Sequence, residues 1–364
     1  MALPRHRRPL ALILAAVTAL GLIGVSIATA DNDEPVPPVK PARLIVSTLE
    51  ALSARFWVSG EVESRLDLGL PVVPEEWGGD SGLVGLVRGT NRFRLWRSPR
   101  GVRLAHMTDS SEQVFVANRR KGWWWDSVEF RATRVRRRDL LDALYTGWVG
   151  RMLASGEQSA AAMTTARLSD PIRLARYLLR EFAPTASVRV RGTTEVAGRS
   201  AYRLIMNPRS DVTLIGSVSL AIDVETRLPL RVRVMPSGSH EAAIEAVFTE
   251  VSFDRVGRRM FQFRPPAGAE VVDALDDLDS RHRRPRAIRR AVRRAGRNVS
   301  IIGSGFESRW IVRLKNGAPS SLAQQMPYQG PLVSALLIDG PRRDWLLAGP
   351  VPLEVLQADA DRLW

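Results

Sequence analysis

The chain has 364 residues, 45% of them hydrophobic and 25% charged, which allows a substantial buried core and excludes a disordered or fibrous protein. It contains no cysteine, which excludes disulfides, thiolate metal sites, a cysteine nucleophile and a lipid-modified cysteine anchor. The formal net charge of +15 is carried almost wholly by arginine, because Lys40, Lys121 and Lys315 are its lysines, and two interpretations stay open: GC-rich codon bias and a selected anionic partner.

Residues 1–30 have the pattern of an export signal. Arg5, Arg7 and Arg8 precede an apolar run at 10–27 and a small-x-small site at 28–30. The run approaches the roughly 20 residues that cross a bilayer, so an uncleaved signal anchor and a cleaved signal peptide both remain open, with the anchor preferred. We therefore expect an extracytoplasmic protein, anchored in the plasma membrane by an N-terminal helix or secreted after cleavage. Residues 31–42 are a Pro-rich tether.

The next elements predict a meander of strands interrupted by helices. Residues 43–55 place Ile45, Leu49 and Leu52 on one face of an amphipathic helix. From residue 56 the period of the pattern changes to two, which is typical of strands. Further helices are predicted at 138–153 and 170–182. The predicted strands are 56–62, 91–97, 101–107, 112–118, 121–126, 128–134, 187–195, 200–207, 217–224, 230–235 and 241–254.

The C-terminal part is set apart by its charge. Residues 274–298 form an acidic and then Arg-rich linker, so we expect one domain at 43–273 and a small α/β domain at 299–364. The predicted fold class is mainly β (α+β), a half-open antiparallel β-barrel of about 10–11 strands with three amphipathic helices as a lid. In the C-terminal domain, strands are expected at 299–302, 310–314, 332–338 and 345–347, and a helix at 353–363.

Several strands alternate arginine with apolar residues, as Phe93 and Leu95 do with Arg92 and Arg94. The simplest interpretation is a core face and a solvated face. Three short helices cannot cover so wide a sheet, however, so we hypothesise a ligand cavity on the apolar face. The residues assigned to this cavity are Trp57, Phe93, Leu95, Leu104, Phe115, Trp123, Trp125, Trp148, Leu204, Met206, Val232, Val234 and Phe248.

The run Trp123-Trp124-Trp125 places its outer two indoles on one face and the middle one on the other. At least one indole is then expected to be exposed or to gate the opening of the cavity. The alternative is that all three simply pack in the core.

Catalytic and cofactor sites find no support in the sequence. His106 and His240 have no partner at metal-ligand spacing, and nucleophile-elbow, phosphate-loop and dinucleotide glycine motifs are absent. We therefore expect no enzyme activity, no metal and no cofactor.

The Arg-rich part of the linker carries a second candidate site, for an anionic membrane surface or a partner. It could form a basic amphipathic helix against anionic headgroups, or remain a solvated linker. Nucleic acid, the other usual partner of such a run, is disfavoured by the export signal. The residues assigned here are Arg284, Arg289, Arg290, Arg293 and Arg294.

The order of strands and helices resembles the LolA-like superfamily of lipoprotein carriers and RseB-type sigma-factor regulatory proteins, and more closely the membrane-anchored members of high-GC Gram-positive bacteria. The motifs that carry the resemblance lie at 56–62, 89–96, 196–202, 217–234 and 261–269, within a matched region of about 43–273. The resemblance implies a sheet whose helices lie as a lid over an acyl-chain cavity. The appended linker and tail depart from the minimal carrier but are similar in placement to the second domain of RseB-type proteins.

Two functions follow as hypotheses. The first is non-enzymatic binding of a lipid or lipoprotein acyl chain at the outer face of the plasma membrane. The second is an RseB-like envelope-stress sensor that regulates an anti-sigma factor or other membrane protein by contact through residues 299–364.

Overall fold

A computed structural model describes residues 37–54, 56–67, 89–118, 121–136, 182, 184–273, 299–314, 323–340 and 344–362. The export signal at 1–30, the helix predicted at 138–153, most of the helix predicted at 170–182 and the linker at 274–298 lie outside the described residues. The predictions made for them therefore stay predictions.

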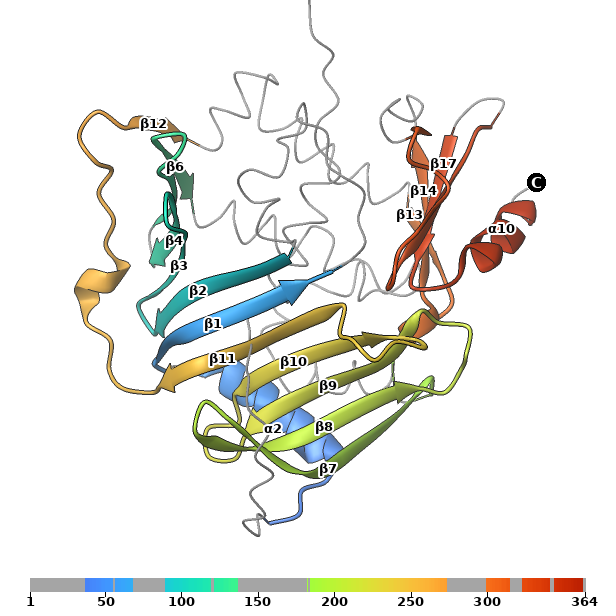
Figure 1. Ribbon diagram of the computed structural model, residues 1–364, viewed down its shortest axis with the longest axis horizontal. Coiled ribbons are helices and arrows are strands. Elements are labelled where there is room, and N and C mark those ends of the chain that lie inside the picture. The colour runs from blue at the N-terminus through green and yellow to red at the C-terminus, as the bar shows by residue number, and fades with distance from the viewer. Residues whose placement is uncertain are drawn as a thin grey trace, which may run out of the picture.

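The largest part of the described structure is one open sheet. Its twelve strands are hydrogen-bonded in the order β12-β6-β5-β4-β3-β2-β1-β11-β10-β9-β8-β7, so β12 and β7 are edges and the sheet does not close into a barrel (Figure 1). Neighbouring strands pair antiparallel, except β12 and β6, which pair in parallel. The strands are β1 (Val58–Leu66), β2 (Gly89–Ser98), β3 (Gly101–Met107), β4 (Glu112–Asn118), β5 (Lys121–Asp126), β6 (Arg131–Arg136), β7 (Ala186–Val196), β8 (Arg199–Pro208), β9 (Ile215–Asp223), β10 (Pro229–Pro236), β11 (Ile244–Ser252) and β12 (Glu270–Asp273).

The eleven strands predicted for this region are all present, most of them within two residues of the predicted bounds. The prediction of about 10–11 strands is one short, because β12 was assigned to no element. Its position explains why: β12 is a four-residue edge strand that pairs with β6 across more than a hundred residues of sequence. No local pattern signals such a pairing.

The start of β6 also differs from the prediction, which began a strand at Val128. Residues 127–130 form a turn instead. The buried carboxylate of Asp126 accepts hydrogen bonds from the backbone N–H groups of Val128 and Glu129, and Phe130 has a left-handed backbone with φ 46°. An Asp side chain that bonds the amides two and three residues on competes with the strand ladder, so the strand begins later, at Arg131.

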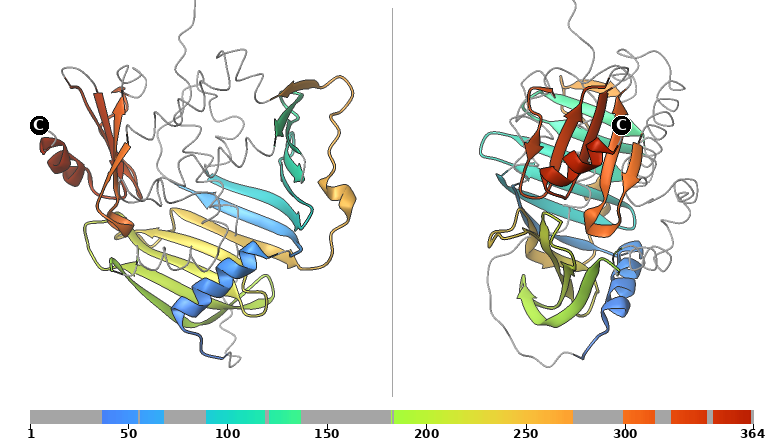
Figure 2. Two further views of the ribbon diagram at one scale, coloured as in Figure 1. Left: turned by 180° about the vertical axis from the view of Figure 1, so that it is seen from behind. Right: turned by 90° about the vertical axis from the view of Figure 1, so that its right-hand side faces the viewer.

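Helix α2 (Pro41–Ser53) packs on one face of the sheet, behind it in Figure 1 and in front of it in the left view of Figure 2. Pro41 suits the first turn of a helix, where its missing N–H has no partner to lose. The buried side of α2 is centred on Leu44 and Thr48, so Ile45, Leu49 and Leu52, which are half-buried, flank the contact rather than form its centre. Leu44 packs with Tyr202, Leu204 and Ile222 of β8 and β9.

A second sheet of five strands lies at the end of β8 and β9 (Figure 1), in the order β13-β14-β17-β16-β15. Helix α10 (Leu353–Asp361) packs on it and is held by Arg309, whose Nε donates to the carboxylate of Asp359 at 2.5 Å. The backbone N–H of Leu214 and the hydroxyl of Thr213, between β8 and β9, both donate to the carbonyl of Pro350 at 2.8 Å and so join the two sheets. The strands are β13 (Val299–Ile302), β14 (Arg309–Leu314), β15 (Tyr328–Gln329), β16 (Ser334–Ile338) and β17 (Asp344–Gly349).

Candidate functional site

The strand register fixes which side chains share a face of the large sheet, because directly opposed residues of neighbouring strands point the same way. We call the side on which α2 packs the apolar face and the other side the arginine face. Leu204 lies opposite Leu220, which lies opposite Val232, and the same relation continues through Ala246 on β11 to β1 and β2. Nine of the thirteen predicted cavity residues share the apolar face: Phe93, Leu95, Leu104, Phe115, Leu204, Met206, Val232, Val234 and Phe248.

One part of the apolar face lies under α2. Leu44 is 0% exposed and contacts Leu204, which is 1% exposed, and Ile222, which is 0% exposed. Full burial of one such aliphatic side chain contributes about 1.5–3 kcal/mol to folding. This part of the apolar face is therefore hydrophobic core, in agreement with the simpler interpretation of the alternation, a core face and a solvated face.

The other part belongs to strands β2–β6, which we call the wing; beyond β2 its strands turn away from the plane of β7–β11 (Figure 1). Leu95, Leu104, Phe115 and Trp124 form one row across β2, β3, β4 and β5. All four are half-buried, although they are as apolar as the residues under α2. The apolar face of the wing therefore keeps hydrocarbon and aromatic surface that solvent or a bound apolar group can reach.

His106 lies at the edge of this row, with its ring centroid 5.2 Å from that of Phe93. Burial lowers the pKa of His106 below its ordinary value. The imidazole is therefore neutral at neutral pH, which keeps a positive charge away from the apolar face.

The assignment of Trp123 and Trp125 to the cavity is wrong, because both lie on the arginine face and not on the apolar face. Phe115 lies opposite Trp124, so the middle indole belongs to the apolar face and the outer two to the arginine face. There Trp123 and Trp125 are buried against Phe263, with ring centroids 5.8 and 6.2 Å away. Figure 1 shows the segment between β11 and β12 on this outer side of the wing. The prediction that the outer two indoles share a face is confirmed. The sequence did not show which of the two faces of the sheet they occupy, because Val114 and Val116 make the arginine face of β4 apolar too.

The remaining predicted site residues either lie away from the apolar face or fall outside the described residues. Trp57 precedes β1, is half-buried, and has Arg255 over its ring at 5.5 Å. Trp148 lies outside the described residues, as do the five linker arginines, Arg284, Arg289, Arg290, Arg293 and Arg294. Trp124 is the residue that the sequence argument missed, and its register with Phe115 is the signal that identifies it.

The arginine face carries the charged half of the alternation. Arg94 donates to Glu61 at 2.7 Å, Arg92 lies 3.5 Å from Glu63, and Arg103 lies 3.8 Å from Glu112. These pairs are on the surface of β1–β4 and contribute little to stability, because solvent screens them. They do neutralise the arginines on this part of the sheet.

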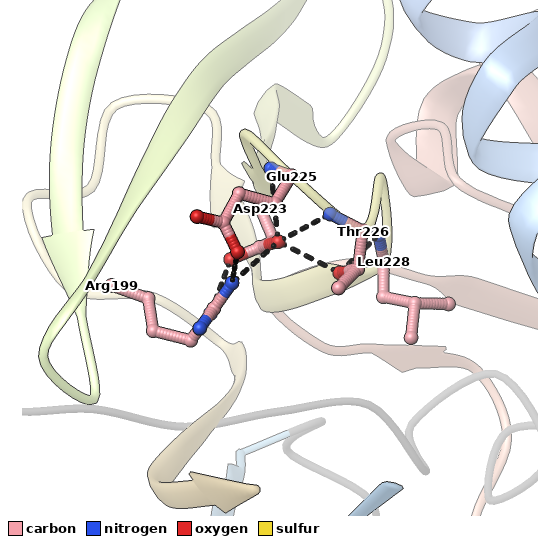
Figure 3. A network of polar contacts seen from close by, with 5 residues as sticks. All are labelled: Arg199, Asp223, Glu225, Thr226 and Leu228. Atoms are coloured by element: carbon pink, nitrogen blue, oxygen red, sulfur yellow. Dashed lines mark hydrogen bonds and ion pairs between the residues drawn. The ribbon is translucent and has the colours of Figure 1, made fainter. Parts of the chain in front are cut away.

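A buried ion pair stabilises the bend between β9 and β10 (Figure 3). Asp223 is 1% exposed and accepts hydrogen bonds from Arg199 Nε at 2.6 Å and from the backbone N–H and hydroxyl of Thr226. Arg199 also donates to Glu225 at 2.7 Å. Burial alone would raise the pKa of Asp223, but the hydrogen bonds from Arg199 and Thr226 outweigh it and lower the pKa below its ordinary value. The carboxylate is ionised and structural.

Among the described residues, no group of three or more acidic or histidine side chains is placed to hold a metal ion. No helix in the same ranges is long and apolar enough to cross a membrane.

The comparisons with known proteins give similarities of fold. No family model matches the sequence, and no curated protein matches it. The MucA/MucB complex of Pseudomonas aeruginosa has a chain that is 13% identical, with a TM-score of 0.47 over 88% of this chain and 96% of that one. MucB in complex with MucA(peri) is 14% identical, with a TM-score of 0.45 over 87% of this chain and 96% of that one. A LolA superfamily protein from Nitrosomonas europaea is 8% identical, with a TM-score of 0.21 over 62% of this chain and 99% of that one.

Proposed function

We propose that the apolar face of the wing binds an acyl chain of a lipid or lipoprotein, without catalysis, at the outer face of the plasma membrane. The observation that supports this most directly is the row of Leu95, Leu104, Phe115 and Trp124, which is apolar yet only half-buried. Apolar surface that stays accessible costs about 25 cal/mol per Å² relative to burial, so an acyl chain laid along it would be stabilised.

Hydrocarbon is the ligand chemistry that this row suits. Its side chains offer no hydrogen bond apart from the indole N–H of Trp124, and the neighbouring imidazole of His106 is uncharged at neutral pH. A charged ligand would need polar partners, whereas an acyl chain needs contact alone. The export signal predicted at 1–30 supports binding outside the cytoplasm, and the resemblance to lipoprotein carriers agrees with it.

Two tryptophans of the wing allow a matched test. Trp124 and Trp96 are both half-buried indoles, but Trp124 lies on the apolar face and Trp96, opposite Arg103, on the arginine face. Binding of a fluorescent fatty acid to the purified full chain is measured by titration. We expect Trp124→Ala to weaken binding about tenfold, from the loss of roughly 1.4 kcal/mol of aromatic contact, and Trp96→Ala to leave it unchanged. Equal effects of the two substitutions, or no probe binding by the unaltered protein, would refute the proposal.

A second candidate is a regulator that senses envelope lipids or lipoproteins and acts on a membrane protein by contact, as RseB-type proteins do on an anti-sigma factor. The second sheet favours it, because a simple carrier has no need of one and Pro350 ties it directly to the loop between β8 and β9. MucB was solved in complex with MucA, which is the kind of assembly this candidate implies. Purification from host membranes separates the two functions. Abundant bound acyl lipid supports carriage, while an empty protein that retains a membrane protein only when residues 299–364 are present supports regulation.

A further inference from the structure

Four arginines lie close together on the arginine face of strands β7–β10. Arg203 on β8 and Arg231 on β10 both lie opposite Ala221 of β9. Arg189 on β7 lies opposite Ile205, which lies opposite Ser219, and Ser219 lies opposite Arg233. The four side chains, which we call the arginine patch, therefore frame the small residues Ser219 and Ala221. Ala221 is 3% exposed, so the space above it is filled, and the exposed cationic side chains of the patch are those of Arg189 and Arg203.

The arginine patch has fewer counter-charges than the rest of this face. Glu245 is the carboxylate of the patch, and it already lies 3.3 Å from Arg233. Within the described ranges no carboxylate comes within 4.0 Å of Arg189, Arg203 or Arg231. Arg203 donates its Nε to a backbone carbonyl, that of Arg191, which is itself exposed. On the neighbouring strands β1–β3, by contrast, Arg92, Arg94 and Arg103 each have a glutamate.

The inner part of the patch is also incompletely hydrogen-bonded. The Nε atom of Arg231 is buried without a hydrogen-bond partner, and the buried Nε of Arg233 makes only the ion pair with Glu245 at 3.3 Å. Burial lowers the pKa of Arg231, Glu245 opposes this shift, and the nearby charge of Arg233 adds to it. Two guanidinium groups are thus held close together and partly desolvated. An anion that accepts hydrogen bonds from both would relieve this cost.

We propose that the arginine patch binds the phosphate groups of anionic phospholipids at a bilayer surface. The extent of the patch favours a surface over a single ion, since β7 and β10 are three strand spacings, or about 14 Å, apart. Arg189 and Arg203 are exposed, Arg233 keeps part of its side chain accessible, and Arg231 is half-buried. The patch is on the face opposite to the wing's apolar row, so the membrane contact and the acyl-binding face are separate. The inference does not depend on the proposed function.

The test is co-sedimentation of the full chain with vesicles of pure phosphatidylcholine and with vesicles containing about 30% phosphatidylglycerol. The difference between the two lipids isolates the charge-dependent part of binding from any contribution of the N-terminal apolar segment. The variant Arg189→Gln/Arg203→Gln removes two exposed patch arginines. Its control, Arg92→Gln/Arg94→Gln, makes the same change in net charge at two arginines that already have carboxylate partners.

We expect the patch variant to reduce the phosphatidylglycerol-dependent affinity about thirtyfold, at roughly fivefold for each arginine near an anionic surface, and the control to reduce it less than threefold. Arg231→Gln, checked for folding by its melting temperature, should give a further loss. Equal losses in patch and control variants would mean that net charge alone acts, and would overturn the proposal. Complete displacement by millimolar glycerol phosphate would also overturn it, because the patch would then be a site for a single soluble phosphate.

Discussion

The strands under α2 and the strands of the wing carry the same alternation on the same face but end in different environments. Leu204, beneath α2, is 1% exposed, while Leu104, in the equivalent apolar position of the wing, is half-buried. Both have apolar cross-strand neighbours, Leu220 in one case and Phe115 in the other. What differs is the helix that packs on the first group and, among the described residues, has no counterpart on the second.

The two regions show that the face a side chain occupies and its degree of burial are separate properties, although the same strand pattern is used to predict both. Alternation determines which face a side chain occupies, whereas burial depends on what packs over that face. The same apolar residue types can therefore form either a hydrophobic core or a binding surface. In this protein the division between them falls where the contact of α2 ends, between the strands that bear Leu204 and those that bear Leu104.

The largest expected effect tests this division directly. Leu204→Ala should lower the free energy of unfolding by about 3 kcal/mol, because it leaves a cavity against Leu44 and Ile222. Leu104→Ala should lower it by about 1 kcal/mol, because a half-buried side chain loses less contact on truncation. Urea unfolding followed by circular dichroism measures both.

The same pair of variants gives the opposite order in a binding assay. Leu104→Ala should weaken fatty-acid probe binding, and Leu204→Ala should leave it unchanged as long as the protein is folded. If the two leucines destabilise the fold equally, the wing is core and the division between the two regions is wrong.

The next effect concerns the bend that lies beside the α2-covered strands. Asp223→Asn should lower the free energy of unfolding by about 2 kcal/mol at neutral pH, because it leaves Arg199 without its buried partner. The folded-state pKa of Asp223 lies below the ordinary value of 3.8, so its contribution is present above that pH and is lost as the pH falls through the folded-state pKa. The difference in melting temperature between the two proteins should be constant from pH 7 down to about pH 4 and should narrow as the pH falls below 3.8. A difference that stayed constant far below pH 3.8 would contradict the assignment.

Much of the sheet was predictable because its signals are local. The hairpin between β7 and β8 turns at Ala197 and Gly198, both with positive φ, as the sequence Val196-Ala197-Gly198-Arg199 suggests. The arginine-apolar alternation of β8 and β10 identifies their faces, since one side of each strand is charged. The same signal fails at β5, where Trp123, Trp124 and Trp125 give three apolar residues in succession and the register with β4 alone decides.

Non-local features could not be predicted in this way. β12 depends on pairing with β6, and the burial of Trp125 depends on Phe263, which lies more than a hundred residues away. The half-burial of the wing likewise depends on where α2 lies, and the stripe within α2 does not specify its partner strands. Sequence periodicity describes one helix or strand at a time, whereas these features depend on contacts between two elements that are far apart in the sequence.

The smallest expected effect tests the contact between the two regions themselves. Arg97, on β2 of the wing, donates Nη2 to the carbonyl of Leu52 at 2.8 Å and stacks over the ring of Phe56 at 4.1 Å. Its guanidinium thus satisfies a free carbonyl in the last turn of α2 and fixes that end of the helix to the wing. Arg97→Met keeps most of the side-chain volume but removes the donor, and should cost about 1 kcal/mol in urea unfolding. Hydrogen exchange should quicken at the C-terminal turn of α2 and stay unchanged in β8 and β9. Faster exchange throughout α2 and β8 would instead show that the wing and the covered strands form one cooperative unit, and the two regions would then have to be treated as a single core.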